Sequence, residues 1–244
     1  MAGALTRDRY LFAVHAAVTA LGDLVPDAPP SAPEWDTPVP SCPGWDLGDL
    51  VGHVGVVHRW ALAALRSDSP PEEGEPPPRA DLADWFRSGA AALTEALARI
   101  DPDHPCWGFG PKPRTAAFWI RRQAHENSMH AWDAADALGD SGWLDPELAA
   151  DGVDEVARMF YPRQVRLGRR DPVASTVALT STDVGRTAVL GDGEPVATVA
   201  GPAEPLLLAI WRRREVGALL DEGVLTLTGD VGVAREVLSG PLTP

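Results

Sequence analysis

The sequence predicts an α+β protein in which a bundle of four helices precedes a small α/β unit. In the first two thirds of the chain, apolar residues recur at helical spacing, and proline-rich loops separate the helical segments. After about residue 165 the pattern changes to short segments rich in β-branched residues, with Gly and Asp turns between them. The 244 residues are 45% apolar, which is ample for packed cores. We therefore expect two domains, residues 1–163 and residues 164–244.

The first helix is expected over about residues 6–24. Its apolar residues recur at helical spacing: Leu11, Val14, Val18 and Leu21. The stretch also resembles a short signal peptide, but Asp8 and His15 interrupt it, which favours an amphipathic helix. Because no apolar run reaches the roughly 18 residues of a membrane span, we expect no association with a membrane.

The second helix is expected to begin at Asp46, whose carboxylate can cap the free N–H groups of the first turn. Asp49, three residues on, favours the same helix start. An apolar stripe follows at i, i+3 and i+7 spacing: Leu47, Leu50, Val54, Val57 and Ala61. An acidic, proline-rich linker then leads to a third helix over about residues 80–99, and a fourth helix carries "FWIRRQAHENSMHAWDAADALG". Four helices joined by loops suggest an antiparallel bundle, whose core is a usual place for a metal site.

The C-terminal part is expected to contain four strands and two helices. The strands are predicted in "ASTVALTSTD", "TAVLG", "VATVAG" and "VLTLTGD". Between the last two strands, "GPAEPLLLAIWRRR" is typical of a helix, with Pro202 in its first turn and arginines at its end. A short helix closes the chain. These elements form a small α+β unit.

Charge and cysteine content exclude several classes of function. A formal net charge of −14 with no basic run makes a nucleic acid or an anionic membrane surface a poor partner. Cys42 and Cys106 are too few for a disulfide framework or a Cys-rich zinc site, so a reducing cytoplasm is the simpler location. Cys42 is expected to pack the turn in which it lies. Lys112 is the only lysine, a skew that indicates a GC-rich bacterial genome, such as an actinobacterial one.

The fourth helix carries a candidate pair of metal ligands. Glu126 and His130 are four residues apart and therefore lie on one helix face, whereas His125 lies about 100° around the helix from Glu126. Arg122 and Asp133 share the stripe of the pair and can hold the two ligands in place. The spacing alone favours a solvated polar stripe on an ordinary helix over a metal site.

Two ligands do not make a zinc site, and a third must come from elsewhere in the chain. The second helix offers His53 and His58. Both flank its apolar stripe, and the periodicity does not choose between them.

Two segments together resemble a known family. "VPSCPGWDLGDLVGHVGVVHRWA" followed by "RRQAHENSMHAWDA" is similar to the mycothiol-dependent maleylpyruvate isomerase family of the DinB-like metal-binding superfamily. "VATVAGPAEPLLLAIWRRR" is similar to the second domain of that family, which has a sterol-carrier-like α/β fold. The resemblance covers nearly the whole chain, and implies a DinB-like four-helix bundle followed by that domain.

The resemblance also implies which residues bind the metal. The histidine of the family lies first after the "CPGW" turn, which is His53, and the later Glu and His match Glu126 and His130. Zn²⁺, or another divalent metal, is the implied ion, with one coordination position left open. The family further uses an arginine of the second domain, and among the three arginines of "WRRR" Arg213 fits best, although Arg212 and Arg214 stay open. The alternative interpretation is that all three arginines cap a helix C-terminus.

The implied function is a zinc-dependent isomerase or S-transferase that uses mycothiol. A metal-activated thiolate would attack a small electrophilic substrate, so the expected partners are a low-molecular-weight thiol and that electrophile. The expected assembly is a monomer or a small homo-oligomer in the cytoplasm. Two alternatives remain: a thiol-independent tailoring enzyme on the same scaffold, and a non-catalytic protein that binds a metal or ligand.

Overall fold

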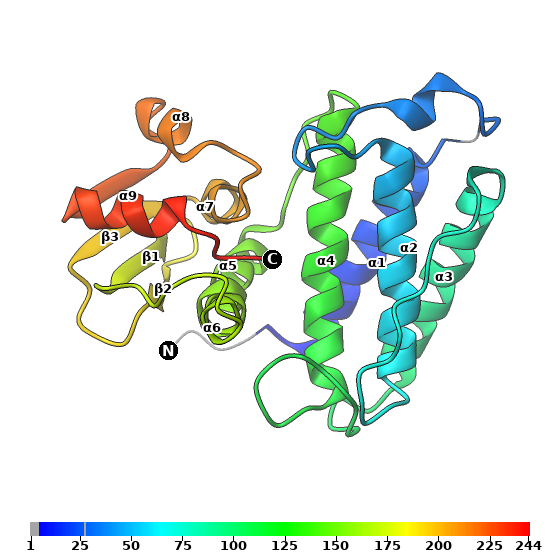
Figure 1. The fold of residues 1–244 in the computed structure, drawn as a ribbon, viewed down its shortest axis with the longest axis horizontal. Coiled ribbons are helices and arrows are strands. Elements are labelled where there is room, and N and C mark those ends of the chain that lie inside the picture. The colour runs from blue at the N-terminus through cyan, green and yellow to red at the C-terminus, as the bar shows by residue number, and fades with distance from the viewer. Residues whose placement is uncertain (1–4, 27) are drawn as a thin grey trace. The chain divides into compact units, whose positions relative to one another are not determined.

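Residues 6–143 form a bundle of long helices in the computed structural model, which describes residues 5–26 and 28–244 (Figure 1). The bundle helices are α1 (Arg7–Leu24), α2 (Leu47–Ala64), α3 (Arg79–Arg99) and α4 (Ala116–Ala137), with a 3₁₀ turn, η1 (Pro33–Asp36), before α2. Helix α1 packs against α4, and α2 packs against both α3 and α4. This arrangement confirms the helical bundle that the sequence predicts. In the part of the chain that the structure describes, no helix combines the length and the apolarity required to cross a bilayer.

The start of α2 is fixed by contacts among neighbouring residues. The backbone N–H of Asp49 donates to Oδ1 of Asp46 at 2.8 Å, and the N–H of Asp46 donates to Oδ2 of Asp49 at 3.1 Å. This reciprocal cap satisfies two N–H groups that the helix itself leaves free. Arg79, at the start of α3, donates to the other carboxylate oxygen of Asp46 at 2.8 Å. The capped helix start therefore also ties α2 to α3.

The inner faces of the helices form a continuous apolar core. Its largest fully buried side chains in the bundle include Leu21, Leu47, Leu50, Phe86 and Leu93. Gly55 of α2 permits the ring of Trp85 to lie against the helix backbone, because a Cβ at this position would come 2.2 Å from the ring. The predicted apolar stripe of α2 is buried apart from Val57, which is half-buried.

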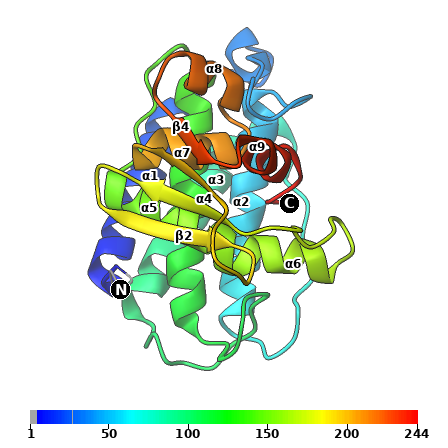
Figure 2. The same ribbon diagram turned by 90° about the vertical axis from the view of Figure 1, so that its left-hand side faces the viewer.

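The second unit comprises Leu144–Pro244 and is built on a four-stranded sheet, whose strands appear as yellow and orange arrows in Figure 2. The strands are β1 (Val177–Ser181), β2 (Arg186–Leu190), β3 (Ala197–Gly201) and β4 (Thr226–Gly229). Their order is β2-β1-β3-β4. β1 is parallel to β3 but antiparallel to β2, and β3 is antiparallel to β4. Leu179 in β1 pairs with Ala188 on one side and Val199 on the other, which places β1 at the centre.

Six helical segments accompany the sheet. They are α5 (Pro146–Glu155), a π-helical turn η2 (Val156–Phe160), α6 (Tyr161–Arg166), α7 (Ala203–Ile210), α8 (Val216–Asp221) and α9 (Val231–Ser239). Helix α5 packs on α7 and on β2, and α7 and α9 both contact β1 and β3. The four predicted strands and the closing helix are present. The helix predicted in "GPAEPLLLAIWRRR" is shorter than expected: Pro202 is its N-cap, and α7 ends at Ile210, so the three arginines follow the helix instead of lying in its last turn.

The division between the two units lies earlier in the chain than the change in sequence pattern predicts. The contacts divide the chain between Trp143 and Leu144, whereas the predicted boundary follows residue 163. Residues 146–163 are helical, so the change from helical to strand-like sequence comes after them. Their packing partners, however, are α7 and β2 of the second unit. A boundary drawn where the pattern changes therefore misses the point where the contacts change.

Candidate metal centre

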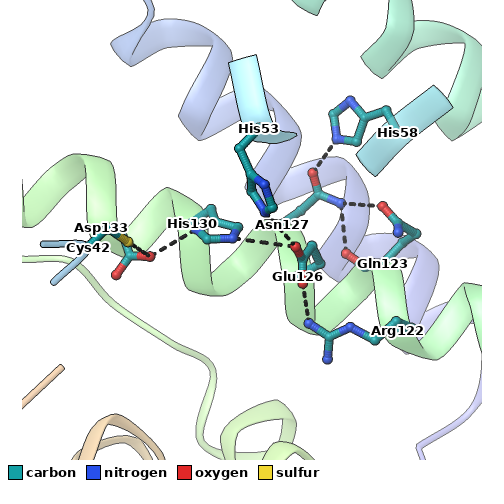
Figure 3. Close-up of polar contacts among 9 residues, drawn as sticks. All are labelled: Cys42, His53, His58, Arg122, Gln123, Glu126, Asn127, His130 and Asp133. Carbon is teal, nitrogen blue, oxygen red and sulfur yellow. Dashed lines mark hydrogen bonds and ion pairs between the residues drawn. The ribbon is translucent and has the colours of Figure 1, made fainter. Parts of the chain in front are cut away.

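Three side chains from two helices converge within the bundle (Figure 3). His53 projects from α2, and Glu126 and His130 project from α4. Oε1 of Glu126 lies 3.4 Å from Nε2 of His53 and 3.4 Å from Nε2 of His130. The ligand atoms of all three residues lie within 4.8 Å of one another. The structure therefore brings together the three residues that the resemblance implies.

The spacing of these atoms fits a shared metal ion better than direct hydrogen bonds. An N–H···O hydrogen bond spans about 2.7–3.2 Å, so 3.4 Å is long for one. Zinc binds nitrogen and oxygen ligands at about 2.0–2.1 Å, and two corners of such a tetrahedron are then about 3.3–3.4 Å apart. The set offers two imidazoles and one carboxylate, all usual zinc ligands. The imidazole of His53 keeps the cluster open, because 31% of its side chain is exposed, against 10% for His130.

Arg122 supports the carboxylate from the side away from His53. Its guanidinium donates to Oε2 of Glu126. The two carboxylate oxygens therefore have different partners, because Oε2 faces the arginine and Oε1 faces the two histidines (Figure 3). Burial alone would raise the pKa of Glu126. The charge of Arg122 and the contacts with the histidines outweigh burial and hold this pKa well below its usual range. Glu126 is therefore a carboxylate at any pH near neutrality.

Asp133 supports His130 in a similar way. Oδ2 of the fully buried Asp133 lies 2.9 Å from Nδ1 of His130, and Asp133 accepts a hydrogen bond there. This contact places Nε2, the other ring nitrogen, toward Glu126. Burial would lower the pKa of His130, but Asp133 and Glu126 together raise it to about 9 in the metal-free protein. Both supporting roles, of Arg122 and of Asp133, agree with the prediction from helical spacing.

Cys42 extends this chain of contacts by one residue. Its thiol donates to Oδ2 of Asp133 at 3.7 Å, so Cys42, His130 and Asp133 form a second group of metal-ligating side chains. The 2.9 Å between His130 and Asp133 is a hydrogen-bond length and leaves less room for an ion than the 3.4 Å spacings around Glu126. The thiol of Cys42 thus does more than pack its turn, because it contacts the carboxylate that orients His130.

The turn before α2 positions both Cys42 and an aromatic neighbour of the site. The N–H of Val39 donates to the carbonyl of Trp45, and the N–H of Trp45 donates to the carbonyl of Cys42, both at 3.0 Å. Gly44 has a φ of 87° within this turn, a conformation that few other residues adopt. The closed turn places the ring of Trp45 4.9 Å from the ring of His53. The "CPGW" segment therefore contacts one candidate ligand, His53, directly and another, His130, through Asp133.

The other two histidines of the candidate set lie away from the cluster. His125 is buried and presents its ring edge-on to Tyr10 of α1, at a centroid distance of 6.3 Å. His58 is fully buried, and its Nε2 lies 2.6 Å from Oδ1 of Asn127. Figure 3 shows this pair on the flank of α4 that also carries Gln123. No pattern in the sequence predicts this contact, because nothing in the spacing relates His58 to a residue 69 positions away.

Trp119 shares the Glu126 stripe but belongs to an aromatic cluster two turns away. It is fully buried, and its ring lies 5.2 Å from Trp60 of α2 and 6.1 Å from Trp107. The indole N–H donates to the carbonyl of Trp107 at 2.6 Å. Trp119 is therefore a core residue of the bundle.

The three arginines of "WRRR" follow α7 in the second unit, and each makes a contact of its own. Arg212, with a φ of 59°, donates to the carbonyl of Ser239 at the end of α9 at 2.8 Å. Arg213 donates to the carbonyl of Trp211 at 3.0 Å, and its guanidinium lies 5.6 Å from the ring centroid of that residue. Arg214 lies 3.3 Å from Glu222. The catalytic role of Arg213 stays a prediction.

Known proteins share both halves of this architecture. Residues 14–135 match the model of the mycothiol maleylpyruvate isomerase N-terminal domain, and residues 147–236 match that of the MDMPI C-terminal domain. A crystal structure of a mycothiol-dependent maleylpyruvate isomerase superposes with a TM-score of 0.60 at 13% identity, covering 84% of this chain and 88% of the other. A histidine-to-alanine mutant of such an isomerase gives 0.61 at 14% identity, covering 93% and 95%. These structures share the fold.

Relatives identified from sequence match only part of this chain. Two uncharacterized proteins of Mycobacterium tuberculosis, from strains CDC 1551 / Oshkosh and H37Rv, are each 28% identical over 127 residues. The match spans 50% of this chain and 65% of the length of each relative. The two domain models between them cover most of the chain in the order in which the two units occur. The chain therefore belongs to the mycothiol maleylpyruvate isomerase family.

Proposed function

We propose that this protein is a zinc-dependent isomerase or S-transferase that uses mycothiol as its thiol. The observation that carries the proposal is the convergence of His53, Glu126 and His130, with 3.4 Å between the carboxylate oxygen and each imidazole nitrogen. Membership of the family supports mycothiol as the thiol, since the related crystal structures are those of a mycothiol-dependent isomerase. Another divalent ion would fit the same donor set, and zinc is the ion that two imidazoles and a carboxylate suit best.

The residues of the cluster define what the site can hold. Glu126 supplies the single negative charge among the three ligands, and the buried charges of Arg122 and Asp133 offset each other. A bound zinc ion would lower the pKa of a thiol in its open position, so that the thiol reacts as a thiolate near neutral pH. An anionic thiolate also balances the one positive charge that a divalent ion would retain at this ligand set. His53 leaves the cluster accessible to such a molecule.

The reaction proposed for the thiol needs no redox change. The sulfur adds to a conjugated double bond, the resulting single bond rotates, and elimination of the thiol restores the double bond in the other geometry. In an S-transferase the sulfur instead stays bonded to the substrate carbon, and the enolate left by the addition takes up a proton from solvent. Arg213 is proposed to hold a carboxylate or another polarised group of the substrate, because a guanidinium can donate two parallel hydrogen bonds to it.

Metal content tests the first half of the proposal. The full chain as purified should carry close to one zinc ion, measured by elemental analysis, and His53→Ala or Glu126→Ala should remove it. His125→Gln is the matched control, because this buried histidine of α4 faces Tyr10 and should keep its metal. Protein that contains no metal and takes up none when zinc is added would refute the metal site.

Thiol dependence tests the second half. The metal-loaded protein is incubated with mycothiol and a panel of electrophiles that includes maleylpyruvate, and adducts and isomers are followed by mass spectrometry and chromatography. We expect turnover that requires the thiol. Turnover without thiol would instead indicate a thiol-independent tailoring enzyme. No turnover and no binding of thiol by calorimetry would indicate a protein that only binds a metal or ligand.

A further inference from the structure

A buried polar contact joins the two helices that carry the cluster, outside the cluster itself. Nε2 of His58 on α2 lies 2.6 Å from Oδ1 of Asn127 on α4, and both side chains are fully buried. His58 follows His53 by five residues, and Asn127 follows Glu126 directly. The contact therefore lies within about two turns of all three candidate ligands.

Hydrogen bonds within α4 fix the direction of this contact. The amide nitrogen of Asn127 donates to the backbone carbonyl of Gln123 at 2.8 Å and to Oε1 of Gln123 at 3.2 Å (Figure 3). Oδ1 of Asn127 must then be the atom that faces α2, so it accepts a hydrogen bond from Nε2–H of His58. Because Gln123 holds Asn127 on its own helix, the acceptor is a rigid point on α4, one residue from Glu126.

The remaining contacts between the helices define their relative direction but not their exact offset. His53 meets Glu126 and His130, and further along α2 Trp60 meets Trp119, so the two helices run antiparallel. Apolar side chains pack without strong directionality, and such an interface tolerates small sliding movements. A buried hydrogen bond of 2.6 Å tolerates much less, because either partner becomes unsatisfied when it moves away.

The contact also has a cost that an apolar pair would avoid. Nδ1 of His58 and Nε2 of Gln123 are buried, and neither has a hydrogen-bond partner among the described residues. A polar contact that is retained despite such a cost is best attested where it specifies one arrangement over its neighbours.

We propose that His58 and Asn127 are positioning residues, whose hydrogen bond sets the offset of α2 along α4 and so holds His53 at ligand distance from Glu126 and His130. This inference rests on the proposed metal site. It assigns to His58 a role that does not involve contact with the metal.

Three variants of the full chain separate positioning from stability. His58→Gln keeps an N–H donor near the place of Nε2. His58→Leu removes the donor and leaves Oδ1 of Asn127 unsatisfied. The double variant His58→Leu/Asn127→Leu removes both polar partners, which relieves that penalty. Zinc affinity is measured by competition with a chromophoric chelator, the coordination geometry by the visible spectrum of the cobalt(II)-loaded protein, and stability by the thermal midpoint of the metal-free protein.

We expect His58→Gln to resemble the wild type in all three measurements. His58→Leu should lower the thermal midpoint and weaken zinc binding by about 10-fold or more, the scale seen when a residue that supports a ligand is lost. The double variant should recover much of the thermal midpoint, but not the zinc affinity, and its cobalt spectrum should differ from that of the wild type. Leu93→Ala, a cavity in the core at a fully buried position of α3, serves as the control that lowers the midpoint without changing zinc affinity.

The inference is overturned if the double variant binds zinc as tightly as the wild type with an unchanged cobalt spectrum. If the leucine variants do not fold, His58→Asn is compared with His58→Gln, because the shorter amide of Asn cannot reach Asn127. Equal zinc affinities of these two variants would overturn the inference. Wild-type protein that binds no metal overturns the proposed function and this inference together. Normal binding by the wild type with unaffected variants overturns the inference alone.

Discussion

Nδ1 of His130 lies 2.9 Å from Oδ2 of Asp133, a carboxylate that is fully buried and one helical turn further along α4. This contact determines which ring nitrogen of His130 faces Glu126. Cys42 donates to the same oxygen from the turn before α2, so the orienting carboxylate is itself held from two sides. The orientation of one candidate ligand therefore depends on residues from both segments that resemble the family.

Replacement of Asp133 by Asn should weaken metal binding while leaving the fold intact. The amide oxygen can still accept a hydrogen bond from Nδ1–H, but the negative charge that makes the imidazole more basic is lost. We expect zinc affinity to fall by about 10- to 100-fold, measured by chelator competition. Asp136→Asn, an exposed position on the same helix, should bind zinc like the wild type. Equal affinities for the two variants would contradict the role given to Asp133.

Zinc uptake near neutral pH should release a proton from His130. In the metal-free protein the pKa of His130 is raised to about 9, so this imidazole is protonated at pH 7 and must lose its proton to bind an ion. Affinity should rise with pH up to about 9, by about tenfold per unit where His130 is the group that titrates. Calorimetry at pH 7 in buffers of different ionisation enthalpy measures the release. A zinc affinity that does not change between pH 7 and pH 9 would show that zinc does not displace a proton from His130.

His58 should make the protein less stable in mild acid. Burial lowers the pKa of His58 to about 4, below the usual 6.5, so the unfolded chain takes up a proton that the folded protein does not. The stability contributed by the neutral imidazole is present above pH 6.5 and is lost as the pH falls toward 4. Between pH 7 and pH 5 we expect about 2 kcal/mol of loss from this group. Urea unfolding of the wild type and of His58→Gln at both pH values isolates the contribution of His58. The unfolding free energy of the variant should fall by about 2 kcal/mol less than that of the wild type between pH 7 and pH 5.

Replacement of Arg213 by Lys should reduce turnover without removing metal. Lysine keeps the charge but lacks the planar fork that binds a carboxylate through two hydrogen bonds. We expect activity with the best electrophile of the panel to fall by about 10-fold or more, with metal content unchanged. Arg212→Lys and Arg214→Lys are the matched comparisons, because these neighbours contact Ser239 and Glu222. A larger loss in either of them would move the proposed role to that arginine.

The parts of the site that the sequence predicts are those set by contacts within one helix. The cap of Asp46 and Asp49 and the support of Glu126 by Arg122 depend only on residues three or four apart, and all of them occur as expected. Helical geometry fixes such neighbours before any tertiary contact forms.

The parts that it does not predict join segments far apart in the chain. The bond of His58 to Asn127 and the contact of Cys42 with Asp133 both depend on how two helices and a turn meet. Periodicity also did not choose between His53 and His58, because both border the apolar stripe; the resemblance made that choice, and the structure brings His53 to the cluster. The assignment of the ligands themselves stays a prediction.

The position of the candidate ligands in the chain has a consequence for the stability of the bundle. His53 on α2 and Glu126 on α4 are 73 positions apart. A metal ion at this site would act as a cross-link that closes a long loop, which restricts the unfolded chain more than a short loop would. Opening of the bundle would separate these ligand atoms, so a bound ion should oppose that opening. The metal-loaded protein should therefore resist proteolysis better than the metal-free protein.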